Sequence, residues 1–378
     1  MGLARPTAID LFCGAGGMTL GFEQAGFNVV AAFDLAEFNI STHEANFPHT
    51  SAFSVDLAKE TGATLRELAK LGGRDIDVVF GGPPCQGFSV GGRRDADDAR
   101  NLLVYDFARL VRQLCPKYFV MENVKGLMAS HARPVLDSFI RRIKKSGYAI
   151  VEPIRVLNAA DYGVPQRRWR TIILGYRDDL PAPEYPEPRG CVTKDGTRFD
   201  PVVKDAIADL PTLELFDALF EADEFDGRLD DTINPYALLM RGVTTDPTDK
   251  SPPRKVNSQR LTGCLRTKHS KETVRRFRST RSGGAEPISR YIRLAWDDVA
   301  PTIRAGTGTD RGSHTAPRPI HPKLPRCISA REAARLHSLP DWFQFHGTRW
   351  HDFRQIGNSV PPLLARAVAR QIADALAY

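Results

Sequence analysis

A cysteine that follows two prolines is the residue of this sequence best suited to covalent chemistry. Cys85 comes directly after Gly82-Pro83-Pro84, and the apolar run at 78–80 reads as a buried strand. Glycine and proline stop such a strand, and the two prolines hold the backbone rigid. We therefore expect the thiol at the carboxyl end of a strand, where open α/β sheets bind ligands. A buried structural cysteine is the alternative, but the Pro-Pro-Cys-Gln context favours a nucleophile.

The stretch after Cys85 differs from the rigid turn before it. Residues 87–100 contain further glycines, which permit movement, and the basic pair Arg93 and Arg94. Such a segment is typical of a lid whose arginines meet backbone phosphates on closure. A thiol beside a movable basic segment indicates a covalent catalyst that acts on an anionic polymer.

Short apolar strands alternate with helical patterns through the first 175 residues and would supply the framework that holds Cys85. We expect strands at 8–12, 29–33, 53–55, 78–80, 118–121 and 171–174, and the apolar residues at 102–114 follow helical spacing. Strand–helix alternation implies parallel pairing. The predicted fold class is α/β, a doubly wound and mostly parallel sheet with a second, smaller domain.

A glycine-rich turn after the first expected strand is the clue to a cofactor. Gly14, Gly16 and Gly17 let the backbone approach a ligand closely, with a helix just beyond. The spacing matches neither G-x-G-x-x-G nor a Walker motif, so it gives little support to a phosphate cradle. Asp34, after the second strand, is placed to bind a ribose, and Asp56, after the third, to bind an adenine amino group. Together these residues indicate a nucleoside-bearing cofactor.

Charge is distributed unevenly along the chain, although the net charge of +7 is modest. Residues 241–331 contain 20 Lys and Arg against 7 Asp and Glu, whereas residues 178–240 contain 5 against 16. Such polarity favours a polyanion-binding face on one part of the chain. A solvated charged surface is the alternative.

Cysteine usage and hydropathy indicate the compartment. The six cysteines, at 13, 85, 115, 191, 264 and 327, form no C-x-x-C pair, which argues against a zinc site or a disulfide framework. The amino end lacks the apolar stretch of a secretion signal, and no apolar run approaches the length of a membrane span. We expect a cytoplasmic protein with no membrane partner.

Five blocks of the sequence, in order, carry a resemblance to a known family. They are Asp10-Leu-Phe-Cys-Gly-Ala-Gly-Gly17, Gly82-Pro-Pro-Cys-Gln-Gly-Phe-Ser89, Glu122-Asn-Val124, Gln166-Arg-Arg-Trp-Arg170 and Arg354-Gln-Ile-Gly-Asn-Ser-Val360. The chain resembles the C5-cytosine-specific DNA methyltransferases of bacterial restriction–modification systems, over residues 10 to about 175 and 327–377. The resemblance implies the Rossmann-like fold of S-adenosylmethionine-dependent methyltransferases.

The resemblance also implies four catalytic residues. Cys85 would be the nucleophile that adds to C6 of cytosine and so activates C5 toward methylation. Glu122 would interact with N3 of the base and Arg170 with its carbonyl oxygen, while Arg168 would support the catalytic region. Arg168 and Arg170 alternate along a strand and so point to the same side. Because the target base cannot be reached inside a duplex, we expect it to flip into the Cys85 pocket.

The implied methyl donor is S-adenosylmethionine, and no metal is needed. The resemblance selects nine residues for it: Phe12, Gly14, Gly17, Asp34, Asp56, Pro84, Leu103, Asn358 and Ser359. Two departures from the family pattern stand out. Asp34 stands where many relatives carry Glu, and the block usually written Leu-Gln-Ser-Phe-Pro has His337 as its second residue and Leu339 as its fourth. We interpret the second departure as a packing variation without catalytic cost.

The segments between the matching blocks suggest a division into domains. Residues 1–180, completed by 326–378, would form the catalytic domain, and 181–325 a target-recognition domain whose DNA-reading part lies at 254–320. That part interleaves Arg and Lys with Ser, Thr and Gly, which suits phosphate and base-edge contacts. Double-stranded DNA is the expected partner of a monomeric enzyme. A cognate restriction endonuclease, acting on the same site without a stable complex, is a further candidate partner.

Alternative functions share the same catalytic blocks. A tRNA cytosine-5 methyltransferase would carry them too, but the long basic middle region favours a reader of duplex DNA. A catalytically inactive DNA-binding relative is disfavoured by the intact Cys85, Glu122, Arg168 and Arg170, and a cofactor-free scaffold by the glycine turn and Asp34. The sequence leaves open the DNA site and the base that removes the C5 proton.

Overall fold

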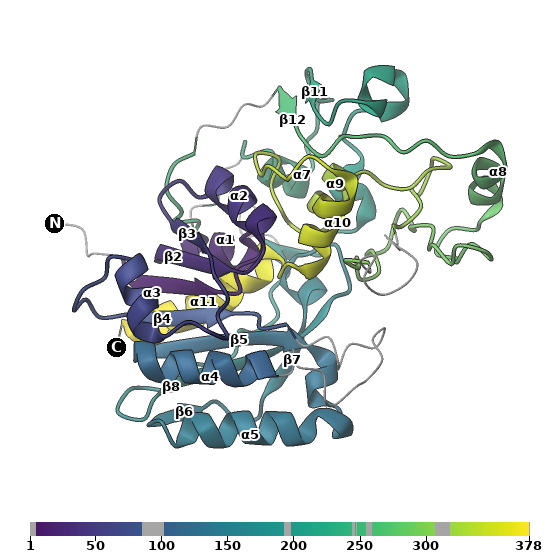
Figure 1. Ribbon diagram of the computed structural model, residues 1–378. Coiled ribbons are helices and arrows are strands. Elements are labelled where there is room, and N and C mark those ends of the chain that lie inside the picture. Colours follow the sequence, from purple (N-terminus) through teal and green to yellow (C-terminus); the bar gives the residue numbers. More distant parts are fainter. Residues whose placement is uncertain are drawn as a thin grey trace.

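A sheet of eight strands lies at the centre of the computed structural model, which describes residues 5–84, 102–192, 198–243, 246, 248–254, 259–306 and 318–377 (Figure 1). The strand order is β3 (Ser51–Ser54), β2 (Asn28–Asp34), β1 (Thr7–Leu11), β4 (Val78–Gly81), β5 (Tyr118–Val124), β8 (Trp169–Arg177) and β6 (Tyr148–Ile150), and β7 (Arg155–Asn158) also pairs with β8. The order reverses between β1 and β4. Ligands bind at the carboxyl ends of strands beside such a reversal.

The first five strands pair in parallel, as the sequence predicts. The late strand β8 does not, because it pairs antiparallel with β5, β6 and β7. Only a short 3₁₀ turn, η5 (Ala159–Tyr162), separates β7 from β8, so no crossover helix carries the chain back for parallel pairing. The sheet is therefore mixed, with a parallel half that ends at β5.

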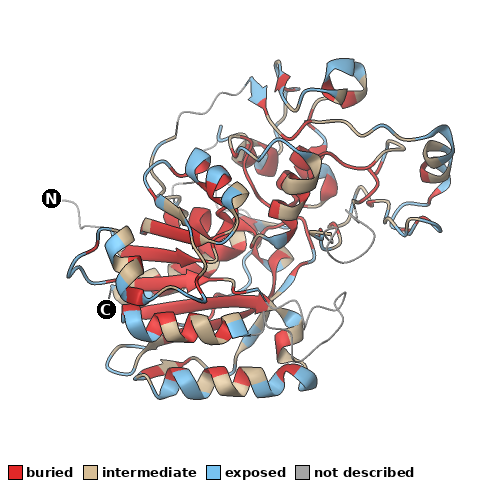
Figure 2. Cartoon of the chain, in the orientation of Figure 1, coloured by how far each residue is buried: buried red, intermediate tan, exposed pale blue. Residues whose placement is uncertain are grey.

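Helices cover both faces of the sheet: α3 (Gly62–Leu68), α4 (Leu103–Leu114) and α5 (Arg133–Lys144) on one face, and α1 (Gly17–Gln24) and α11 (Pro362–Leu376) on the other (Figure 1). Side chains of the central strands alternate between these two layers. Ile9 and Val79 pack in the first, whereas Ala8 and Val78 pack in the second. Burial on both faces (Figure 2) confirms the doubly wound α/β fold.

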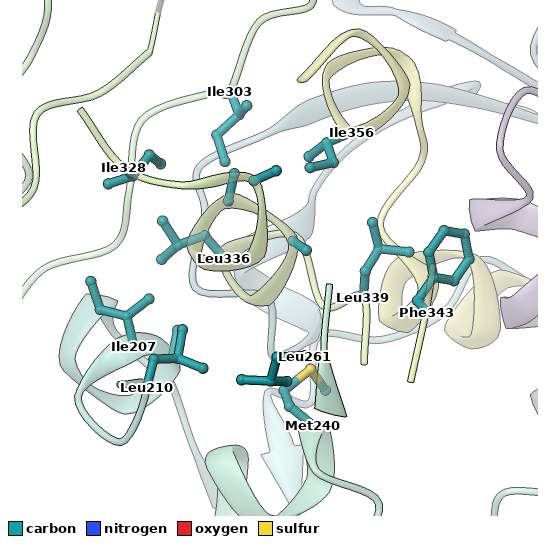
Figure 3. Packing of buried hydrophobic residues seen from close by; sticks show 14 of the residues in the cluster. Ile207, Leu210, Met240, Leu261, Ile303, Ile328, Leu336, Leu339, Phe343 and Ile356 are labelled. Carbon is teal, nitrogen blue, oxygen red and sulfur yellow. The ribbon is translucent and has the colours of Figure 1, made fainter. Parts of the chain in front are cut away.

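A second core of buried apolar side chains joins parts of the chain that are distant in sequence. It surrounds Leu336 of α9 (Ala330–Leu336) and includes Ile207, Leu261, Ile303 and Ile356 (Figure 3). The same cluster also contains residues from the amino-terminal region, Ala15, Leu20 and Phe47. The middle of the chain is thus joined to the carboxyl-terminal segment and to the first helices by one continuous core.

One helix, α8 (Lys271–Ser279), stands apart from the sheet (Figure 1). Its Phe277 packs with Ile320 and Cys327 in a small separate cluster. The Arg293 side chain ties the helix down by donating hydrogen bonds of 3.0 to 3.2 Å to five backbone carbonyls, those of Phe277, Arg278, Thr280, Pro322 and Lys323.

The remaining elements of the described residues are four helices, two strand pairs and four 3₁₀ turns. They are α2 (Glu37–Asn46), α6 (Val203–Ile207), α7 (Pro235–Met240), α10 (Arg349–Asn358), the strand pairs β9 (Cys191–Val192) with β10 (Arg198–Phe199) and β11 (Phe225–Asp226) with β12 (Arg260–Leu261), and the 3₁₀ turns η3 (Lys125–Met128), η4 (Ser130–Ala132), η6 (Leu213–Leu215) and η7 (Asp217–Phe220). Within the described residues, no helix combines the length and apolar character needed to cross a membrane. The same part of the chain contains no group of three or more His, Cys, Asp or Glu side chains that could hold a metal ion.

Candidate active site

An ion pair between Glu122 and Arg170 lies at the carboxyl end of β5. In the antiparallel pairing of β5 with β8, Glu122 is opposite Ile172 and Val124 is opposite Arg170. Residues two apart on a strand share a face, so Glu122 and Arg170 are diagonal neighbours. Arg170 Nε lies 2.5 Å from Glu122 Oε1, and both side chains are largely buried. The sequence places Glu122 beyond a strand end, but β5 continues through Val124, and the ladder with β8 fixes the carboxylate.

Burial dominates the electrostatics of this pair. It raises the pKa of the Glu122 carboxyl, an effect that Arg170 and then Arg168 oppose. A carboxyl group with a raised pKa keeps a proton closer to neutral pH than an ordinary glutamate does. Glu122 is therefore suited to hold a proton against a ring nitrogen, and the Arg170 guanidinium is suited to face a carbonyl oxygen.

The turn that leads to Cys85 lies against Glu122. A Cβ atom on Gly82 would stand 2.7 Å from Glu122 Oε2, so any other residue here would require the carboxylate or the turn to shift. Asn123 Nδ2 donates a hydrogen bond of 3.1 Å to the carbonyl oxygen of Pro83, which ties the turn to β5. Three of the predictions, the nucleophile Cys85, the pair Arg93 and Arg94, and the lid at 87–100, lie outside the described residues.

Arg168 is fully buried and binds the backbone of two distant segments. Its Nη1 donates to the carbonyl of Ile303 at 3.1 Å, and its Nη2 donates to the carbonyls of Gly357 at 2.6 Å and Ser359 at 2.7 Å. Arg167, the residue before it, is exposed and pairs with Asp298 at 2.6 Å. Arg168 thus points inward beside Arg170, and it holds the chain around the pair.

Asp34 holds the glycine turn from the end of β2. Its Oδ2 accepts a hydrogen bond from the Gly14 amide at 2.9 Å, and its Oδ1 accepts from the Ala36 amide at 2.9 Å and from Asn39 Nδ2 at 3.1 Å. A carboxylate offers about four acceptor positions. These three bonds therefore leave room for one hydroxyl, and Asp34 fits a ribose contact while it also shapes the turn.

The turn itself is tightly constrained. Phe12 has φ 61°, a left-handed conformation that bulky residues rarely adopt and that tends to occur at functional sites. Hydrogen bonds of 3.0 Å from the Cys13 amide to Phe33 and from the Gly16 amide to Cys13 hold it. A Cβ on Gly17 would overlap the Ser359 hydroxyl, so the carboxyl-terminal segment closes directly over the start of α1.

The predicted cofactor residues gather at one edge of the sheet. Phe12, Asp34, Asp56 and Pro84 lie at or just after the carboxyl ends of β1 to β4, which coincide because these strands are parallel. The Asp56 carboxylate accepts a hydrogen bond from the Ala58 amide at 3.1 Å and pairs with Lys59 at 3.1 Å. The other two predicted residues lie at helix ends: Leu103 begins α4, and Asn358, which is exposed, ends α10.

Comparison with known proteins identifies the family of this chain. Residues 7–374 match the C-5 cytosine-specific DNA methylase family, which is nearly the whole chain. The chain belongs to this family. It is thus a cytosine DNA methylase, as the five sequence blocks predict.

Relatives of this cytosine methylase are similar to it in sequence over nearly its whole length. The Type II methyltransferase M.XorII of Xanthomonas oryzae pv. oryzae is 50% identical over 374 residues, 99% of this chain and 86% of the relative. M.AgeI of Thalassovita gelatinovora is 32% identical, with 97% and 99% covered. Among solved structures, a prophage-encoded E. coli protein described as a DNA modification methyltransferase superposes with TM-score 0.80 at 33% identity, covering 99% and 100%. S. pombe Dnmt2, at 14% identity and TM-score 0.58 with 99% and 100% covered, shares the fold.

Sequence reasoning assigns no role to several residues that support the methylase site. Asn123 lies within a quoted block, yet its bond to Pro83 depends on how β4 and β5 pair. Buried Asp10, also within a block, accepts a hydrogen bond of 2.7 Å from Thr19, whose hydroxyl lies 3.0 Å from His43 Nε2. Burial raises the pKa of Asp10 and lowers that of His43 to about 3. His43 is therefore neutral where it contacts Thr19 of α1.

Proposed function

We propose that this methylase transfers a methyl group from S-adenosylmethionine to C5 of a cytosine within a specific sequence of double-stranded DNA, through base flipping and a covalent bond between Cys85 and C6. One observation carries the proposal most directly. The buried Glu122–Arg170 pair lies against the turn at 82–84, whose last residue immediately precedes Cys85. A proton donor and a cation are thus gathered beside the segment that carries the nucleophile.

Cys85, Glu122 and Arg170 have separate roles in the proposed reaction. The Cys85 thiolate forms a bond to C6, and the electron pair displaced from the ring is stabilised by the proton that Glu122 holds at N3. Arg170 faces the carbonyl oxygen of the base, where negative charge would otherwise accumulate. C5 then gains the methyl group, loses its proton to solvent, and the thiolate leaves C6. Glu122 and Cys85 end the cycle as they began it.

The turn after β1 and its neighbours would hold the methyl donor. When bound, S-adenosylmethionine supplies its methyl group from a sulfonium, which needs no metal. The free acceptor position of Asp34 suits a ribose hydroxyl, and the Asp56 carboxylate suits an adenine amino group. The nine residues named for this pocket, including Phe12 and Ser359, are proposed on that basis.

We further propose that residues 181–325 recognise the target and that 254–320 contain the DNA-reading part. The helix α8 supports this assignment, because it is largely exposed (Figure 2) and stands apart from the sheet. Lys271, Arg275 and Arg278 recur at helical spacing and are all exposed, so they form one basic face. The matched family, C-5 cytosine-specific DNA methylase, favours DNA over tRNA as substrate. The relatives, named Type II methyltransferases, make a cognate restriction endonuclease a candidate partner. We propose that the enzyme acts as a monomer in the cytoplasm.

A substrate that stops the reaction after methylation tests the covalent step. Bisulfite sequencing of plasmid DNA from cells expressing the enzyme first identifies the methylated site. A duplex with 5-fluorocytosine at that site should then trap the enzyme, because fluorine cannot leave C5 as a cation. The expected result is a complex stable to denaturing gel electrophoresis that requires S-adenosylmethionine and is lost in Cys85→Ala. Methylated DNA from active enzyme without any trapped complex would overturn the mechanism.

A further inference from the structure

Two buried polar side chains outside the candidate site connect the segments that form it. Gln166 lies just before β8, and His337 follows the last residue of α9. Both are fully buried, so each hydrogen bond they lose would leave an unsatisfied polar group. Their bonds reach Ile303, in the proposed DNA-reading part, and Ser359, in the proposed cofactor pocket.

The first of these segments, residues 300–305, is held along its length by the residues before β8. Gln166 Oε1 accepts a hydrogen bond of 3.1 Å from the Ile303 amide, and Arg168 Nη1 binds the carbonyl of the same residue at 3.1 Å. Thr302 Oγ1 donates to the Arg167 carbonyl at 2.7 Å, and the Arg167 amide donates to Ala300 at 2.8 Å. Both backbone groups of Ile303 are therefore bound by side chains from the active-site region.

The second segment is held from the same point. His337 Nδ1 lies 3.1 Å from Gln166 Nε2, and its Nε2 lies 3.1 Å from the Ser359 carbonyl. Gln166 Nε2 can only donate, so Nδ1 accepts and the proton is on Nε2, which donates to Ser359. Burial, and then Arg168, lower the pKa of His337 well below its ordinary value, so the ring is neutral. The Ser359 carbonyl thus receives donors from His337 and from Arg168.

The two segments also touch one another. A Cβ on Gly357, two residues before Ser359, would overlap the amide of Ala305. Ile303 packs in the same apolar core as Leu336 and Ile356 (Figure 3). Residues 300–305 are therefore enclosed between the residues before β8 and the end of α10, with Gln166, Arg168 and His337 bridging them.

We propose that Gln166 and His337 are positioning residues that keep the DNA-reading part and the cofactor pocket in register, so that occupancy of one site changes affinity at the other. The inference rests on the proposed function, because it needs both ligands. Binding free energies coupled in this way are reciprocal and amount to about 5- to 150-fold in affinity. His337, interpreted from sequence as a packing variation, would then have a specific role.

The test measures this coupling directly. Calorimetry gives the Kd of S-adenosylhomocysteine with and without a duplex that carries the methylated site, and the ratio of the two values is the coupling factor. We expect His337→Leu, which loses both hydrogen bonds, to reduce the factor at least about fivefold, toward one. His337→Gln, the usual family residue, keeps an acceptor and a donor and should restore it to within about twofold of wild type. Gln166→Met, which loses the bond to His337 and those to Ile303 and Leu336, provides a second loss of the bridge.

A matched control separates positioning from general destabilisation. His321 is another buried histidine, and its Nδ1 accepts hydrogen bonds from the Lys323 and Leu324 amides, away from Ile303 and Ser359. His321→Leu should lower thermal stability but leave the coupling factor unchanged. A wild-type factor of one, or a factor in His337→Leu and Gln166→Met equal to that of wild type, would overturn the inference. If no cytosine in plasmid DNA became methylated, the proposed function itself would fail instead.

Discussion

At Glu122 the fold places a carboxyl group on which burial and a neighbouring guanidinium act in opposite directions. Burial favours the protonated form, and Arg170 at 2.5 Å favours the ionised one. This balance suits a group that holds a proton at N3 while the thiol attacks and must recover it for the next cycle. The carboxylate is fixed from two sides, by the register of β5 with β8 and by the backbone at Gly82.

Glu122→Gln tests that role with little change of shape. The amide keeps an acceptor for Arg170 but removes the titrating group, so kcat for DNA methylation should fall by about 10²- to 10⁴-fold. The Kd for S-adenosylhomocysteine should not change. Single-turnover transfer of a tritiated methyl group and calorimetry measure the two quantities. Glu152→Gln, at an exposed acid that pairs with Lys144, is the control. A loss smaller than about tenfold would contradict the assignment.

Gly82→Ala tests the close approach of the turn to Glu122. The new Cβ would stand 2.7 Å from Oε2, so either the carboxylate or the turn must move. A misplacement of about 1 Å can cost about 100-fold in rate, and we expect a loss of that order in kcat. Gly73→Ala is the matched control, because a Cβ there meets no atom within 4 Å. Equal kcat in the two variants would show that the turn has room to spare.

Asp352, buried within α10, makes stability depend on pH. Burial and then nearby Asp223 raise its pKa to about 7, from an ordinary value of 3.8. Between these values the unfolded chain releases a proton that the folded chain keeps, so this group lowers stability as pH rises, and its full cost is present above about pH 7. Asp352→Asn keeps an oxygen for the Gly347 amide and cannot ionise.

The variant should therefore be more stable than wild type at pH 8, by roughly 1–4 kcal/mol, with the difference vanishing near pH 4. Urea unfolding at pH 4, 6 and 8 measures it. A difference that did not change with pH would mean that Asp352 does not titrate in this window.

At the residue scale, the sequence supports a proposal for the site residues but does not predict their contacts. Glu122, Arg168 and Arg170 stand in short blocks whose residue types suit the chemistry. The partners of Arg168, however, lie 135, 189 and 191 positions away, at Ile303, Gly357 and Ser359. No local sequence pattern predicts contacts between residues so far apart in the sequence, because such contacts depend on how separate segments pack. The contacts of His337 with Gln166 and Ser359 depend on the same packing.

At the scale of elements, local alternation predicts the parallel strands and their helices, because each strand–helix unit forms its own crossover. A late strand at 171–174 is predicted, but the antiparallel pairing of this strand, β8, is not, and neither are the short β6 and β7. Their pairing depends on a missing crossover helix and not on periodicity. This reversal has a functional consequence. It brings Arg170 onto the same face as Glu122, from a strand that runs the opposite way.

The basic face of α8 allows a prediction for an element. Lys271, Arg275 and Arg278 are exposed, whereas Phe277 is buried against Ile320. If this face meets phosphates, the triple substitution to Gln should lower the slope of log K against log salt by about 1 for each lost contact, and weaken binding equally for all sequences. Fluorescence anisotropy over a salt series measures the slope. Arg141→Gln with Lys145→Gln, exposed residues at the carboxyl end of α5 and just after it, should leave the slope unchanged. An unaltered slope in the α8 variant would mean that this face meets solvent and not phosphates.

At the scale of the whole molecule, the proposed domains are interleaved. The second core draws on residues from Ala15 to Ile356. Ion pairs also cross between segments: Arg335 of α9 binds Asp209 at 2.8 Å, and Arg254 pairs with Glu23 of α1. A boundary at 181 or 325 is therefore a boundary in sequence but not a gap in packing. Composition and motif order could indicate that the middle differs from its flanks, but not that the two share a core.

Because the proposed domains share a core, the experiment that assigns target recognition needs two chimeras. Exchanging residues 254–320 for those of a relative with a different target should change the methylated sequence, which bisulfite sequencing reads. Such an exchange also replaces residues 300–306, among them buried Ala300 and Ile303 and the Thr302 hydroxyl that binds Arg167. A second chimera that exchanges 254–299 and 307–320 but keeps 300–306 separates the two effects.

Both chimeras should methylate the new sequence, because both receive the same DNA-reading residues. Only the second should retain a kcat within about tenfold of wild type, because only it preserves the contacts that hold 300–305 against the active site. If site choice instead followed residues 1–175, target recognition would lie outside the middle region, and equal kcat in the two chimeras would leave residues 300–306 without a role in catalysis.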